Sequence, residues 1–78
     1  MALAKIEREM AAGGKGCLGK AADDEPVFIL RAQDALAADI VDRWAEWALA
    51  VGCPLAKVQE ARSIAQAMRE WPVHKNPD

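Results

Sequence analysis

The glycine- and lysine-rich stretch near the N-terminus comes closest to the spacing of a chemical motif. Residues 14–21 read Gly-Lys-Gly-Cys-Leu-Gly-Lys-Ala, which fits the G-x-x-x-x-G-K skeleton of a phosphate-binding loop. Glycines of such a loop free backbone N–H groups to face an anion, and lysines add positive charge. However, Ala21 stands where the motif needs a hydroxyl for magnesium, and an acidic stretch with Pro26 follows instead of a helix. We expect no nucleotide hydrolysis here, and either a flexible linker or a simple anion contact through Lys15 or Lys20.

The residues that could act as nucleophiles or metal ligands are few and scattered. The chain holds one serine, Ser63, and one histidine, His74, with no threonine or tyrosine. Ser63 falls within a predicted helix and His74 in the tail, which is a poor arrangement for an activated nucleophile. Cys17 and Cys53 form no Cys-x-x-Cys pair, so no zinc site is expected, and a disulfide between them stays open. We predict a non-enzymatic protein with no catalytic residues, no metal and no cofactor.

Two further regions carry positive charge suited to binding. Arg31 follows the apolar run 27–30, and arginine recognises phosphate and carboxylate groups bidentately. A structural ion pair with a carboxylate is the alternative for Arg31. His74 and Lys75 follow Trp71 beyond the last predicted helix, and they form either a plain tail or a basic lip over a binding site. The predicted ligand-binding residues are Lys15, Lys20, Arg31, Trp71, His74 and Lys75.

The three tryptophans could stack on a ring-bearing ligand, but another role is favoured. Tryptophan at helical spacing more often lies in a core or a subunit interface, and it is the type most enriched in interface hot spots. Three in 78 residues favour an oligomer or a partner surface. The predicted interface residues are Phe28, Trp44 and Trp47.

Two long helices in the C-terminal half must position these side chains. Residues 35–51 have Asp34 as a predicted N-cap and Gly52 as a stop signal. Asp39 and Arg43 can pair at i,i+4 on the outer side of this helix. Apolar residues recur at steps of four, four, three and four, which places them on one helical face. They are Leu36, Ile40, Trp44, Trp47 and Val51.

Residues 54–71 form the second long helix, with Pro54 at its start and Pro72 ending it. Its apolar face consists of Leu55, Val58, Ala61, Ile64 or Ala65, Met68 and Trp71. Only Gly52 and Cys53 separate the two helices. So short a connection favours an antiparallel helical hairpin.

The N-terminal half is less regular. Residues 2–12 predict a short helix that is either docked or frayed, with a thin apolar stripe. The stripe consists of Leu3, Ile6 and Met10. Four glycines in seven positions predict a loop over residues 13–25. Residues 26–34 hold the one β-like run, for which a helical turn or extended segment is favoured over a strand that would pair with another protomer.

We therefore predict a single small helical domain over residues 1–78, all-α or mostly α. It consists of the hairpin, the segment 26–33 packed across it, an appended N-terminal helix, and a tail over residues 73–78. Since 17 of the 78 residues are alanine, the core is small, and a homo-oligomer is expected.

Charge and hydropathy exclude several partners. A net charge of −2 argues against general nucleic-acid binding. No apolar run approaches the roughly 20 residues that a membrane span needs, and the charged N-terminus does not resemble a secretory signal. We expect a cytoplasmic protein without a membrane partner.

The stretch GKAADDEPVFILRAQD is similar to one in short uncharacterised proteins encoded in phages and prophages of proteobacteria. The resemblance covers residues 16–78, with a following helix that contains tryptophan and an end of the form M-R-E-W-P…K-x-P-D. It implies a phage origin and a location in the host cytoplasm. Small phage proteins without catalytic groups often act by binding, and some block host immunity by binding an effector or sequestering a nucleotide signal.

Two functions follow from these observations. The favoured one is a non-enzymatic protein that sequesters a phosphate-bearing small molecule, such as a nucleotide immune signal, by basic and ring-stacking side chains. The alternative is a protein–protein inhibitor or adaptor that acts on a host protein through an exposed apolar face.

Overall fold

The computed structural model describes residues 2–77, which form four helices. These are α1 (Ala4–Ala12), α2 (Gly16–Lys20), α3 (Ala37–Ala50) and α4 (Leu55–Glu70). Between residues 2 and 77 there is no strand, and one isolated bridge joins Asp34 to Lys75. The prediction of an all-α fold is confirmed.

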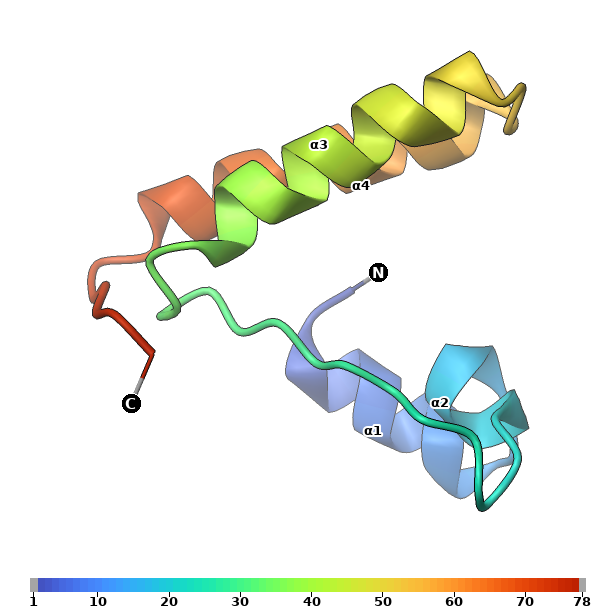
Figure 1. Ribbon diagram of the computed structural model, residues 1–78. Coiled ribbons are helices and arrows are strands. Elements are labelled where there is room, and N and C mark those ends of the chain that lie inside the picture. Colours follow the sequence, from blue (N-terminus) through green and yellow to red (C-terminus); the bar gives the residue numbers. More distant parts are fainter. Residues whose placement is uncertain (1, 78) are drawn as a thin grey trace.

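Helices α3 and α4 form the predicted antiparallel hairpin (Figure 1). Gly52 has a φ of +85°, the left-handed conformation in which glycine commonly ends a helix. The backbone N–H of Cys53 donates to the carbonyl of Ala48 at 2.9 Å, and Pro54 directly precedes α4. The short connection therefore turns the chain back on itself, as the sequence indicates.

The core of the hairpin consists of small side chains. Val58 is the largest fully buried one. The other buried residues are Ala37, Ala45, Ala48, Ala61 and Ala65. Small residues allow two helix axes to approach closely, but each alanine removes little apolar surface from water. The hairpin is thus closely packed around a small core.

The apolar face predicted for residues 35–51 does not pack against α4. Trp44 and Trp47 are 43% and 65% exposed, and the rest of the face is exposed as well. The residues on the α4 side of α3 are the next ones along the chain, a stripe of Ala37, Val41, Ala45 and Ala48. Consecutive residues of an α-helix point about 100° apart around its axis, so this stripe faces a different direction from the predicted apolar face. Tryptophan is too bulky for the narrow space between the helices, whereas alanine fits it.

The glycine-rich stretch 13–25 contains a short helix, α2, where the sequence predicts a loop. Gly14 and Gly16 have φ values of +70° and +71°, which reverse the chain after α1. A Cβ atom on Gly19 would lie 2.8 Å from the carbonyl carbon of Gly14 and 3.1 Å from Cα of Ala11. The same glycines that disfavour a helix by propensity therefore permit this tight turn and close contact.

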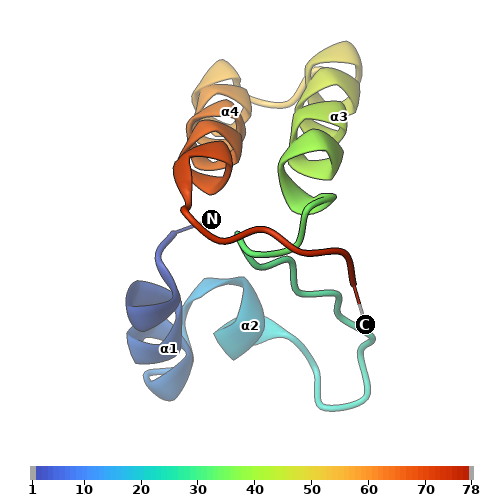
Figure 2. The same ribbon diagram turned by 90° about the vertical axis from the view of Figure 1, so that its left-hand side faces the viewer.

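The two helix pairs are separate packing units. Helix α1 packs on α2 and α3 on α4, while no helix of one pair packs on a helix of the other among the described residues. Figures 1 and 2 show an extended segment running between the pairs. Phe28, in this segment, is 83% exposed, and its neighbours Val27 and Ile29 are exposed too. The segment is extended as predicted, but it does not pack across the hairpin there, because it has to span the distance between the pairs.

Candidate functional site

The end of the hairpin opposite its connecting turn brings distant parts of the sequence together. The backbone N–H of Lys75 donates to the carbonyl of Gln33 at 2.8 Å, and the N–H of Ala35 donates to the carbonyl of Lys75 at 2.8 Å. These two hydrogen bonds, here called the tail bridge, fasten the C-terminal tail to the segment that precedes α3. The residues on either side of the bridge are thereby held in place.

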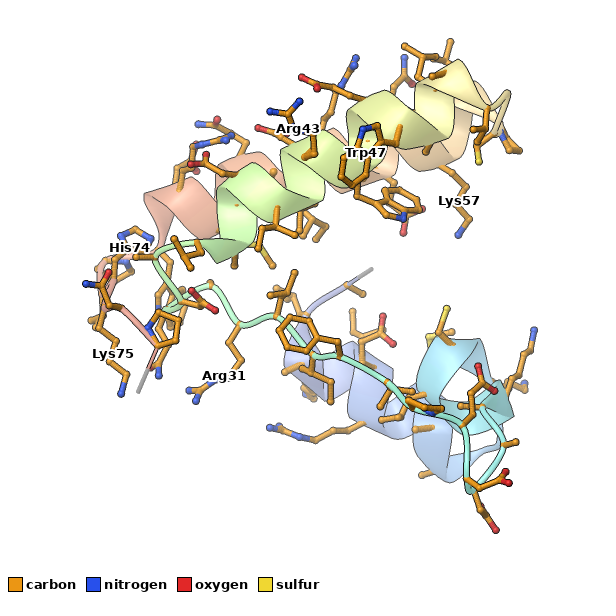
Figure 3. All side chains as sticks on the ribbon, in the orientation of Figure 1. Arg31, Arg43, Trp47, Lys57, His74 and Lys75 are labelled. Atoms are coloured by element: carbon orange, nitrogen blue, oxygen red, sulfur yellow. The ribbon has the colours of Figure 1, made fainter. Side chains whose placement is uncertain are left out.

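Beside the tail bridge, Arg31 and Lys75 line one hollow of about 230 Å³. The other lining residues are Ile29, Gln33, Asp34, Asn76 and Pro77. Figure 3 shows both basic side chains extending from this end of the molecule. We call this hollow, with its two cations, the basic hollow.

Asp34 places a negative charge beside the basic hollow, but its carboxylate already has a partner. Oδ1 of Asp34 accepts a hydrogen bond from the backbone N–H of Leu36 at 2.8 Å. Leu36 itself is the N-cap of α3 and caps it with no side-chain hydrogen bond. The prediction of Asp34 as the N-cap is therefore wrong: Asp34 lies two residues before the N-cap and closes the turn that leads into α3. The lining side chains of the hollow keep a net positive charge.

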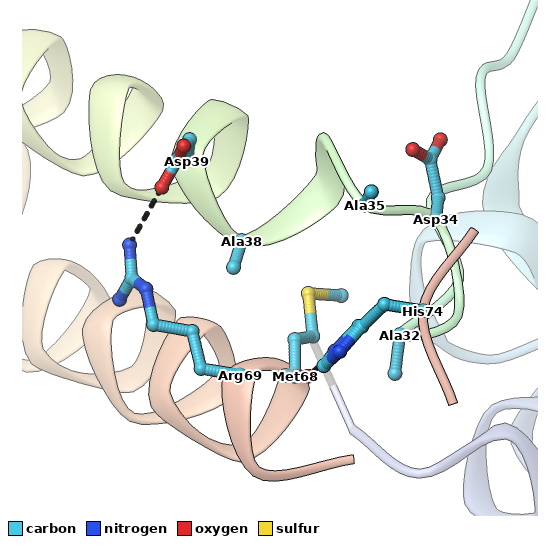
Figure 4. Close-up of a pocket in the computed structure, with 8 residues that line it drawn as sticks. All are labelled: Ala32, Asp34, Ala35, Ala38, Asp39, Met68, Arg69 and His74. Carbon is cyan, nitrogen blue, oxygen red and sulfur yellow. Dashed lines mark hydrogen bonds and ion pairs between the residues drawn. The ribbon is translucent and has the colours of Figure 1, made fainter. Parts of the chain in front are cut away.

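A second hollow, of about 290 Å³, lies between the adjoining ends of α3 and α4 (Figure 4). It is lined by Ala32, Asp34, Ala35, Ala38, Asp39, Met68, Arg69 and His74. Nε2 of His74 lies 2.8 Å from the carbonyl oxygen of Met68 and donates a hydrogen bond to it. The same carbonyl accepts the backbone N–H of Trp71 at 3.2 Å, so His74 provides a second donor at the C-terminus of α4. His74 thus fastens the start of the tail to the hairpin.

Arg69 joins the two helices of the hairpin by ion pairs. Its Nη2 lies 3.0 Å from Oδ1 of Asp39 and also contacts Asp42. The hydrogen bonds that Arg69 donates, first to Asp42 and then to Asp39, raise the pKa of Arg69 above its ordinary value. The predicted pair of Asp39 with Arg43 is wrong, since Arg43 pairs with Glu46 at 3.5 Å. Sequence spacing alone favours partners on one helix and does not reveal that Arg69 of α4 lies nearby.

The structure brings together some of the predicted ligand-binding residues and separates others. Arg31, His74 and Lys75 line the two hollows, and Trp71 ends α4 at the same end of the hairpin. Lys15 precedes α2 and Lys20 is its last residue, and α2 lies far from the C-terminal tail in Figure 1. The glycine- and lysine-rich stretch therefore does not contribute to the basic hollow.

Apolar side chains form the other notable surface of the hairpin. All five residues of the predicted apolar face are exposed, and we call them the tryptophan face: Leu36, Ile40, Trp44, Trp47 and Val51. Trp47 stands on the outer surface of α3 rather than between the helices (Figure 3). Phe28, the third predicted interface residue, is exposed on the extended segment and belongs to neither helix pair.

Other kinds of site are not found in residues 2–77. No three side chains of His, Cys, Asp or Glu lie together as metal ligands there, and Cys17 and Cys53 are free thiols. None of the helices formed by these residues has both the length and the hydropathy of a membrane-crossing helix.

Comparison of the chain with protein-family models, curated proteins and solved structures gives no match. The basic hollow and the tryptophan face are therefore the features from which a function can be inferred.

Proposed function

We propose that the protein is a non-enzymatic binding protein that holds a small phosphate-bearing molecule in the basic hollow. The tail bridge is the observation that carries this proposal, because it places Arg31 and Lys75 in one hollow although they are distant in sequence. A guanidinium can bind two phosphate oxygens in a fixed plane, and an ammonium adds a point charge. Two such groups from separate segments suit one anion better than either does alone.

The surroundings of the hollow fit binding without reaction. Gln33 and Asn76 also line it, and their amides can donate hydrogen bonds to further polar groups of a ligand. Trp71, at the same end of the hairpin, offers an exposed ring for stacking. The carboxylate of Asp34 is held by the N–H of Leu36. A bound molecule would therefore be released unchanged.

Together with the resemblance to phage-encoded proteins, these groups support sequestration of a nucleotide signal of host immunity. A hollow of about 230 Å³ is smaller than the usual 300–1,000 Å³ of a small-molecule site. It suits the phosphate end of a nucleotide, with the base left at the surface. Arg31 is exposed, so its contact with phosphate is partly screened by water.

Isothermal titration of the full chain with a cyclic dinucleotide, and separately with adenosine diphosphate, tests the proposal. We expect Arg31→Ala to weaken binding about tenfold, or about 1.4 kcal/mol. Lys15→Ala is the matched control, because it also removes one exposed positive charge, and we expect less than a twofold effect. No heat from either nucleotide, or equal losses in the two variants, would contradict a site at the basic hollow.

The exposed tryptophan face favours a second candidate function, a protein–protein inhibitor or adaptor that acts on a host protein. Exposed tryptophans are common anchors of protein interfaces. In this case Trp47→Gln, and not Arg31→Ala, would abolish the activity of the protein in the host cell. The two variants therefore separate the two functions.

A further inference from the structure

The chain exposes more surface than a folded monomer of its size. Its solvent-accessible surface is 6157 Å², against about 4,600 Å² for a compact monomer of 8.4 kDa. Its radius of gyration is 13.3 Å, against about 11.5 Å for a compact chain of this length. The excess surface is about 1,500 Å² by the same scaling. The separation of the two helix pairs and the exposed apolar side chains of α3 both contribute to it.

The spacing of the tryptophan face indicates what kind of element covers it. Its members recur at steps of four, four, three and four from Leu36 to Val51, the pattern of a helix that packs lengthwise along another helix. Helix α4 does not provide this contact, because it packs on the neighbouring stripe of Ala37, Val41, Ala45 and Ala48. The tryptophan face is therefore open to a further helix.

The chain's own N-terminal helix is too short for this purpose. Helix α1 has nine residues and is about 13 Å long, whereas the tryptophan face extends for about 23 Å between residues 36 and 51. Helix α1 also packs on α2 and not on the hairpin. Neither α4 nor α1 therefore supplies a helix along this face.

We propose that a second copy of this chain covers the tryptophan face, so that two α3–α4 hairpins form a four-helix bundle. Obligate homodimers bury about 1,000–2,500 Å² on each protomer, a range that contains the excess surface of this chain. A two-fold interface needs the same patch on both partners, and the tryptophan face is apolar along the whole of α3. The net charge of −2 opposes the pairing only weakly.

Dimer formation and ligand binding are separate properties in this arrangement. The basic hollow lies beyond the N-terminus of α3, where the segment before it meets the tail. The tryptophan face lies along the side of α3. A dimer therefore keeps two basic hollows, and failure of nucleotide binding would leave the dimer intact.

Sedimentation equilibrium of the full chain at micromolar concentrations tests the proposal. We expect a species with twice the 8.4 kDa chain mass. Trp47→Gln should raise the dissociation constant at least about 30-fold, since an interface tryptophan contributes a hot spot. Leu49→Gln is the matched control: Leu49 is also exposed, at 47%, but two residues turn it about 160° away from Trp47. We expect its dissociation constant to change less than about threefold.

Circular dichroism checks that both variants remain helical, and Ile40→Gln on the tryptophan face provides a second disruption away from the buried core. A wild-type chain that stays monomeric at all micromolar concentrations tested would overturn the proposal. Coverage of the tryptophan face by the chain's own α1–α2 pair, or by a host protein, would give this result. A dimer that Trp47→Gln and Ile40→Gln leave unchanged, or that Leu49→Gln weakens equally, would also overturn it.

Discussion

Two stripes of side chains run along α3, one residue apart in sequence and opposite in their surroundings. Ala45 and Ala48 are buried against α4, whereas Trp44 and Trp47, the residues just before them, are exposed. Hydrophobicity alone predicts that the tryptophans are buried and the alanines exposed, because burying a tryptophan removes far more apolar surface from water than burying an alanine does. The difference shows that the space between the two helices, and not side-chain hydrophobicity, selects which stripe lies inside.

The largest expected effect comes from enlarging a side chain in the alanine stripe. Ala45 is fully buried, so Ala45→Leu would force α3 and α4 apart. We expect the free energy of unfolding to fall by about 3 kcal/mol, at the upper end of the usual cost of overpacking. Urea unfolding followed by circular dichroism measures this loss. The measurement needs one fixed protein concentration, since association also affects stability.

Ala50→Leu is the matched control for that experiment. Ala50 lies on the same helix and is exposed, so the same added volume meets solvent. We expect its unfolding free energy to stay within about 0.5 kcal/mol of the wild type. Equal losses in Ala45→Leu and Ala50→Leu would show that the alanine stripe is not the close contact of the hairpin.

A smaller effect is expected in the other helix pair, where a glycine makes the close contact. Gly19→Ala places a Cβ atom 2.8 Å from the backbone of Gly14, so α2 has to move away from α1. We expect amide protection from hydrogen exchange to fall in α1 and to stay unchanged in α3 and α4, because the pairs do not pack on each other. The local loss should be about 1–2 kcal/mol.

Gly13→Ala separates this steric effect from a general loss of glycine flexibility. At Gly13 a Cβ atom would meet its nearest neighbour, the carbonyl oxygen of Met10, at 3.6 Å, which is an ordinary contact. Protection in α1 should therefore be kept. If exchange also accelerates in α3 and α4 of Gly19→Ala, the two pairs are coupled and the view of separate units fails.

The sequence allowed the hairpin to be predicted because its ends carry strong local signals. Gly52 and Pro54 mark the turn, and Pro72 follows the last helix. The observed bounds of α3 and α4 therefore differ from the predicted bounds by at most two residues at each end. Helix α2 could not be predicted, because glycine has low helix propensity and the close approach of Gly19 to α1 is a tertiary effect.

The sequence allowed the basic residues of the hollow to be predicted, but not the hollow itself. Positive charge singled out Arg31 and Lys75, but the tail bridge that holds them together uses backbone atoms of Gln33, Ala35 and Lys75. Every residue except proline carries the same backbone N–H and carbonyl groups, so the side-chain types do not show which distant segments will form hydrogen bonds with each other. For the same reason the sequence did not exclude Lys15 from the site.

The smallest effect is expected at the ion pairs between the helices. Arg69 contacts Asp39 and Asp42 at the surface of the hairpin, on residues outside both stripes. Arg69→Gln should lower the melting temperature slightly, and the difference from the wild type should shrink in high salt, because salt screens exposed ion pairs. Arg62→Gln, on the same helix, removes an exposed charge as the control. Differential scanning calorimetry at two salt concentrations measures both variants.

The pH dependence of this contribution has a definite sign. The pKa of Arg69 is raised in the folded protein by Asp42 and Asp39. A raised pKa of a basic group contributes stability that is fully present below its unfolded pKa and is lost as pH rises through the folded value. Moderate alkalinity should therefore leave the difference between Arg69→Gln and the wild type unchanged. A difference that high salt does not reduce would mean that Arg69 stabilises the hairpin by packing of its aliphatic stem instead. A difference that disappears at mildly alkaline pH would contradict a role for the Arg69 charge, because the guanidinium keeps its proton there.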